Sequence, residues 1–141
     1  MAAVGSMTAQ GFASLMSGVD RAEIVGKRLG YVDPPIDLAP GIPGRVIENL
    51  DQSAAAEIAH MIGSLPPAVE KRCFFPFFGV QFLRDGERVS VALCFDCNNA
   101  MTVDGGERGW FAFDGESPEA KALLARLRRS HPPVVKRRPA P

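Results

Sequence analysis

The stretch CFFPFFGVQFLRDGERVSVALCFDCNNA, residues 73–100, has the pattern of two β-strands joined by a tight turn. Its first half is rich in aromatic residues, which favour strands. Its second half alternates, so that one face carries Val89, Val91, Leu93 and Phe95. Because Asp-Gly is a preferred pair for a two-residue hairpin turn, Asp85-Gly86 predicts the point where the chain reverses.

The register of this hairpin brings cysteines together at its open end. With Asp85-Gly86 at the centre of the turn, the pairing continues outward until Cys73 faces Asn98, next to Cys97. Opposed residues in a hairpin have Cβ atoms about 5 Å apart, and diagonal neighbours are about 7 Å apart. Cys94 falls opposite Phe77, three positions before Cys97 in the chain. All three cysteines of the chain therefore lie in this hairpin, and two of them are expected to be neighbours.

Three interpretations of the cysteines remain open. Cys94 and Cys97 have the two-residue spacing of zinc ligands, and Cys73 supplies a third thiolate in that interpretation. The same Cys-x-x-Cys spacing is found in thiol redox proteins, although here it ends a strand instead of opening a helix. In the third interpretation the cysteines are small apolar residues packed in the core.

A Cys-Phe pair that opens one strand and a Cys-Phe-x-Cys motif that closes the next resemble a group of small uncharacterised bacterial proteins. The residues that carry the resemblance are Cys73-Phe74 and Cys94-Phe95-Asp96-Cys97, and the likeness extends over roughly residues 72–127. It implies that the three thiols belong together as a set, and it transfers no function.

The remaining elements are expected on both sides of this hairpin. Residues 45–50 form a strand candidate, and 51–65 have the apolar stripe of an amphipathic helix. Residues 109–115 alternate as a further strand, and 117–129 form a helix with Ser117 as its N-cap. This order favours an α+β fold of two layers, in which an antiparallel sheet of four to five strands carries two main helices packed on one face.

The chain divides into three parts by composition. Residues 1–44 are expected to be poorly structured and rich in proline and glycine, with a short helix over 20–29. Residues 45–130 make up the α+β domain, and 131–141 form a basic, proline-rich tail.

The charge and cysteine content of the chain indicate which partners and which cellular compartment to expect. The 16 basic and 16 acidic side chains cancel, so nothing in the total charge favours nucleic acid or an anionic membrane. No apolar run is long enough for a transmembrane helix, which needs about 18 residues. Three cysteines is a small and odd number for a secreted disulfide scaffold, so a reducing, cytoplasmic setting is expected.

An aromatic patch is the strongest candidate for partner binding. It consists of Phe75 and Phe77 on the first hairpin strand and of Trp110 and Phe113 on the later strand. Large exposed apolar residues are typical of protein interfaces. The alternative is that this sheet face is covered by the proline-rich N-terminal segment.

The resulting expectation is a small cytoplasmic, non-catalytic protein that binds a protein partner, of an accessory or immunity type. The alternative is a zinc-binding domain that uses Cys73, Cys94 and Cys97 as ligands, and a thiol redox protein is the third interpretation. No catalytic residue is assigned, and zinc is the one cofactor considered, under the alternative interpretation.

Overall fold

The computed structural model describes residues 8–26, 45–71, 73 and 78–130, and within them the chain forms three helices and six strands. In chain order these elements are α1 (Ala9–Leu15), β1 (Arg21–Gly26), β2 (Arg45–Leu50), α2 (Gln52–Gly63), β3 (Phe78–Arg84), β4 (Glu87–Cys94), β5 (Asn99–Asp104), β6 (Glu107–Ala112) and α3 (Pro118–Ser130).

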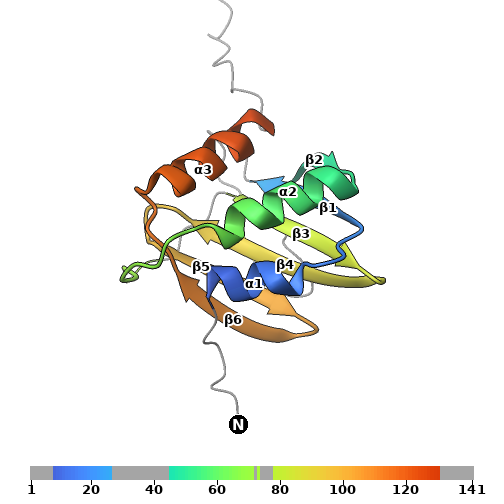
Figure 1. Ribbon diagram of the computed structural model, residues 1–141, viewed down its shortest axis with the longest axis horizontal. Coiled ribbons are helices and arrows are strands. Elements are labelled where there is room, and N and C mark those ends of the chain that lie inside the picture. The colour runs from blue at the N-terminus through green and yellow to red at the C-terminus, as the bar shows by residue number, and fades with distance from the viewer. Residues whose placement is uncertain (1–7, 27–44, 72, 74–77, 131–141) are drawn as a thin grey trace, which may run out of the picture.

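The strands form one antiparallel sheet in the order β2-β1-β3-β4-β5-β6 (Figure 1). The hairpin of β3 and β4 has the predicted register, with Leu83 opposite Arg88. Asp85 and Gly86 have φ angles of 52° and 78°, the left-handed conformation that a two-residue hairpin turn of this kind requires. The α+β class is therefore confirmed, but the described chain has six strands instead of four to five and three helices instead of two.

The additional strand arises where a helix was expected. The helix over 20–29 is wrong, because Arg21–Gly26 forms β1 and pairs with β2 on one side and β3 on the other. Ala22 and Ile24 point into the helix-side core, whereas Val25 belongs to a cluster on the opposite face. Pairing with two neighbouring strands and burial on both faces of the sheet outweigh the local helical pattern.

The additional helix, α1, lies in a segment that was expected to be poorly structured. The Thr8 side chain accepts a 2.9 Å hydrogen bond from the Gly11 amide and so caps the helix. Phe12 is fully buried, with its ring centroid 5.9 Å from that of Phe82 and 6.1 Å from that of Phe111. Arg84 also donates a hydrogen bond to the carbonyl of Leu15. Tertiary contacts therefore hold this short helix in place.

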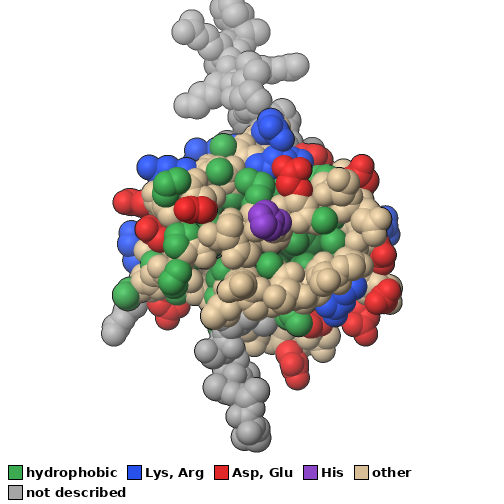
Figure 2. Space-filling model, viewed as in Figure 1, with side chains coloured by type: hydrophobic (Ala, Val, Ile, Leu, Met, Phe, Trp, Pro, Cys, Tyr) green, Lys and Arg blue, Asp and Glu red, His purple; other side chains and the backbone are tan. Residues whose placement is uncertain are grey.

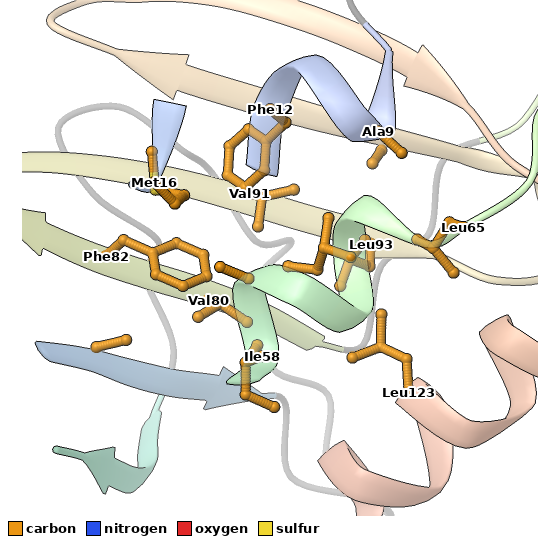
Figure 3. Packing of buried hydrophobic residues seen from close by; sticks show 14 of the residues in the cluster. Ala9, Phe12, Met16, Ile58, Leu65, Val80, Phe82, Val91, Leu93 and Leu123 are labelled. Carbon is orange, nitrogen blue, oxygen red and sulfur yellow. The ribbon is translucent and has the colours of Figure 1, made fainter. Parts of the chain in front are cut away.

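The core lies between the three helices and one face of the sheet, as expected for two layers (Figures 1 and 3). Each helix contributes at least one large side chain, and the central strands supply aliphatic and aromatic residues opposite them. The labelled residues in Figure 3 include Phe12, Ile58 and Leu123 from the helices and Val80, Phe82, Val91 and Leu93 from the strands.

The predicted Ser117 cap is present, Asp51 caps α2, and an ion pair ties α3 to the sheet. Asp51 accepts a hydrogen bond from Ala54 at 2.9 Å, and Ser117 accepts one from Ala120 at 3.1 Å. Arg126 of α3 donates two hydrogen bonds to the Glu48 carboxylate of β2, at 3.0 and 2.9 Å. These hydrogen bonds raise the pKa of Arg126 above its ordinary value.

The opposite face of the sheet carries a second, smaller buried cluster. Its members are Val25, Ala92, Met101 and Val103, none of which belongs to a described helix. The proline-rich segment that was considered as a cover for this face falls in 27–44, outside the described residues. No helix in the described chain combines the length and the apolar character needed to cross a lipid bilayer.

Candidate functional site

The hairpin brings Cys73 and Cys97 together, and the two residues form a disulfide. Their Cα atoms are 5.5 Å apart, although 24 positions separate them in the sequence. The predicted neighbourhood of these two residues is thus confirmed. Cys94 is not part of the disulfide; it retains its thiol, is 2% exposed and pairs with Asn99 across β4 and β5.

The disulfide limits which ligands the cysteines can bind in this structure. Zinc binds cysteine as the thiolate, and the sulfurs of Cys73 and Cys97 are bonded to each other. Among the described residues, no group of three or more His, Cys, Asp or Glu side chains is placed to hold a metal ion. A zinc site of Cys73, Cys94 and Cys97 therefore requires the reduced chain, for which it stays a prediction.

The turn that follows Cys97 is built around Asn98, whose φ of 56° is left-handed. Asparagine tolerates this conformation better than most residues. The Asn98 side-chain oxygen accepts a 3.0 Å hydrogen bond from the Gly115 amide, and its carbonyl accepts one from Phe113 at 3.0 Å. Gly115 lies so close that an added Cβ would be 1.9 Å from the Phe95 carbonyl oxygen. These contacts therefore fix the turn against residues 113–115, which follow β6.

Asn99, the next residue, uses its side chain to hold the carbonyls of Lys71 and Cys73. Its side-chain amide donates to the Cys73 carbonyl at 2.9 Å and to the Lys71 carbonyl at 3.5 Å. The side chain is 4% exposed, and its Oδ1 atom is buried without a hydrogen-bond partner among the described residues. The two asparagines after the Cys-Phe-x-Cys motif thus act as structural clamps.

These clamps hold residues 66–71, which we call the strap. At one end, the Pro66 carbonyl accepts a 2.9 Å hydrogen bond from the Asp114 amide, and at the other the Lys71 amide donates to Cys97 at 2.9 Å. Between them, the Asn98 side chain donates to the Val69 carbonyl at 3.4 Å. In Figure 1 the strap is part of the green coil that leaves α2 and projects at the left-hand edge of the molecule.

The strap presents an apolar side chain to solvent. Val69 is 87% exposed, the highest value among the exposed large hydrophobic residues of the described chain. Pro67, Glu70 and Lys71 are exposed as well. The main-chain amides of Ala68, Val69 and Glu70 make no hydrogen bond to any described residue. A partner can therefore reach the protruding Val69 side chain.

Of the residues predicted to form the aromatic patch, the two that the structure describes do not share one surface. Phe75 and Phe77 lie outside the described residues. Trp110 is 37% exposed and pairs with Met101, on the face opposite the helices. Phe113 is fully buried in the helix-side core, with its ring edge-on to Phe95. Side chains alternate along an extended chain, so positions 110 and 113 point to opposite faces.

A groove of about 620 Å³ runs between α1 and α2, on the side of the molecule that Figure 2 shows. His60 lies on the exposed side of α2 and lines the groove. Several other polar side chains in the lining are already engaged, since Ser14, Gln52 and Ser64 all donate to main-chain carbonyls nearby. The groove is concave, but these groups do not indicate a ligand.

The strap is not predicted from the sequence, because Pro66-Pro67 directly follows a helix and is also a usual signal for its end. Two signals were present: paired prolines that restrict the backbone, and a cysteine just beyond the segment.

Compared with protein-family models, with curated proteins and with solved structures, the chain shows no match. Functional inference therefore depends on the geometry of the site.

Proposed function

We propose that the protein is a non-catalytic protein-binding protein and that the strap is its contact surface. The observation that carries the proposal is the 87% exposure of Val69 on a segment that is held by hydrogen bonds along its length and followed, at Cys73, by the disulfide. An aliphatic side chain in this position has little to bury against in its own chain. A partner that covers it gains on the order of 1.5 kcal/mol or more from apolar burial.

The bracing of the strap supports a role in binding for a second reason. A free peptide loses conformational entropy when a partner orders it, and a segment already held in one shape loses less. Pro66 and Pro67 restrict φ at the start of the strap, while Asn98 and Asn99 hold carbonyls at Val69 and Lys71. The described structure thus contains the kind of pre-organised segment that binds with a small entropic penalty.

The chemistry of the braced segment favours binding over catalysis. The groups that hold the strap are side-chain amides, main-chain groups and a disulfide. Amides and main-chain groups neither gain nor lose a proton near neutral pH, and they are poor nucleophiles. They are suited to fixing a shape that a partner recognises.

Site-specific photocross-linking tests this proposal. A photoreactive amino acid in place of Val69 is expected to cross-link one discrete protein in an extract of the source cells. Unlabelled wild-type protein should compete, whereas a Val69→Asp variant should not. The matched control carries the same photoreactive group at Glu57, an exposed position on α2. The same product from both positions, or no competition by wild-type protein, would contradict the proposal.

A further inference from the structure

We infer that the Cys73–Cys97 disulfide is a redox switch for the binding surface: the strap keeps its binding shape while the disulfide is intact and is released when a small thiol reduces it. This inference rests on the proposed function and names how that surface is regulated. It follows from three observations: what holds the C-terminal end of the strap, where the disulfide is attached and which of its two cysteines is more exposed.

The strap is anchored by a buried side chain at its N-terminal end only. Leu65 is buried in the core, and the next described residue with a buried side chain is Phe78, where β3 begins. Of the described residues between these two, 66–71 and 73, none is buried. A segment that buries little apolar surface is among the first to open locally. The C-terminal end of the strap therefore depends on hydrogen bonds and on the disulfide.

The hydrogen bonds that hold this end come from one turn, residues 97–99, and the disulfide joins the same turn. The Lys71 amide donates to the Cys97 carbonyl at 2.9 Å, and the Asn98 side chain donates to the Val69 carbonyl at 3.4 Å. The second of these bonds is long and therefore weak. The disulfide keeps the donors and acceptors close together, which lowers the entropic cost of forming the bonds. After reduction, the hydrogen bonds have to hold the strap without this covalent link.

Cys73 is the side of the disulfide at which a small thiol can attack. It is partly exposed, whereas Cys97 is 1% exposed. The thiolate of a monothiol such as glutathione attacks the Cys73 sulfur, forms a mixed disulfide there and releases the Cys97 sulfur, which takes up a proton. A second monothiol attacks the sulfur of the first, so that Cys73 leaves as a thiol and the two small thiols form their own disulfide. The protein gains two electrons and two protons, and the small thiols lose them.

NMR relaxation of the backbone amides tests the release in the full-length protein. In the oxidised form we expect the Lys71 amide, which donates to Cys97, to have the order parameter of rigid backbone, about 0.85. In excess reduced glutathione the value should fall below about 0.6, and reoxidation should restore it. The matched control is the Phe113 amide, which donates to the Asn98 carbonyl of the same turn and should stay rigid in both forms.

Three results of this measurement overturn the inference. The first is a disulfide that glutathione does not reduce, and the second is an unchanged order parameter at Lys71 after reduction. The third is an equal fall at Phe113, because reduction then loosens the turn and the sheet beside it and not the strap alone.

Cross-linking from position 69 connects the switch to binding. With the photoreactive amino acid there, Cys73→Ser/Cys97→Ser should give at least about tenfold less cross-linked product than the wild type, because the binding shape is then populated only in part. A rigid Phe113 amide shows that this variant is folded. Cys94→Ala retains the disulfide and is the control, with an unchanged yield expected. Equal yields from the serine variant and the wild type overturn the inference and leave the proposed function standing. No discrete product from the wild type contradicts the proposed function, and the inference falls with it.

Discussion

The side-chain amide of Asn99 donates a 2.9 Å hydrogen bond to the carbonyl of Cys73, 26 positions earlier in the chain. This contact gives a physical reason for the composition of the motif at the end of β4. Cys97 supplies the disulfide, Asn98 adopts the left-handed turn and Asn99 binds the incoming chain. The Cys-Phe-x-Cys-Asn-Asn sequence therefore encodes a structural clamp in the oxidised protein.

Replacing Asn99 by alanine should lower the free energy of unfolding by about 1 kcal/mol, because the Cys73 carbonyl loses its donor in a partly buried site. Urea unfolding followed by circular dichroism measures the difference. Asn49→Ala on the exposed edge strand β2 is the control and should change stability by less than about 0.5 kcal/mol. Equal effects of the two substitutions would show that the Asn99 contact does not stabilise the fold.

Removing the disulfide should destabilise the protein by about 3 kcal/mol, the loop-closure entropy expected for cysteines 24 positions apart. Unfolding of Cys73→Ser/Cys97→Ser beside the wild type gives this number. Thiol titration of the denatured wild-type chain should find Cys94 alone without reductant, and all three cysteines after reduction. Three reactive thiols in unreduced protein would speak against the disulfide.

The same titration bears on cellular location. The small and odd number of cysteines favours a reducing, cytoplasmic setting, whereas structural disulfides persist mainly in oxidising compartments. Cytoplasmic location therefore stays a prediction. Protein quenched with acid at lysis preserves the thiol state that it had in the cell, and a Cys73–Cys97 disulfide in that sample would argue against the cytoplasm.

The parts of the fold that local chemistry encodes could be predicted from the sequence. The β3–β4 register follows from Asp85-Gly86 and an alternating strand, and the start of α3 follows from its cap at Ser117. In the site, the same register placed Cys73 beside Cys97. Each of these inferences uses residues that are close in the sequence or joined by one tight turn.

The parts that depend on distant contacts could not be predicted in the same way. Residues 21–26 form a strand because β2 and β3 pair with both of its edges. The seven residues of α1 stay helical because Phe12 docks against the sheet. The exposure of Val69 follows from how Leu65 and Cys73 are fixed in space, which no local pattern reports.

Phe12→Ala tests whether α1 is an integral part of the domain. Phe12 is fully buried against Phe82 and Phe111, so its truncation should cost about 3–5 kcal/mol of unfolding free energy. Leu15→Ala, on the same helix at 37% exposure, is the control and should cost less than about 1 kcal/mol. Urea unfolding compares the two variants. A similarly small loss for both would mean that α1 contributes little to stability.

Arg126→Met should lower the free energy of unfolding by about 1 kcal/mol, a modest value because Glu48 is 32% exposed and solvent screens the pair. The hydrogen bonds to Glu48 raise the pKa of Arg126 in the folded protein. A group with a raised folded pKa contributes stability below its unfolded pKa and loses that contribution as pH rises through the folded pKa, which for arginine lies far above neutral. The difference between wild type and variant should thus be constant from about pH 6 to about pH 9. Denaturant unfolding at several pH values measures this difference in unfolding free energy. The control is Arg129→Met, which makes the same chemical change at an exposed position near the end of α3. A loss equal to that of Arg129→Met, or one that changes across this pH range, would contradict the role assigned to the pair.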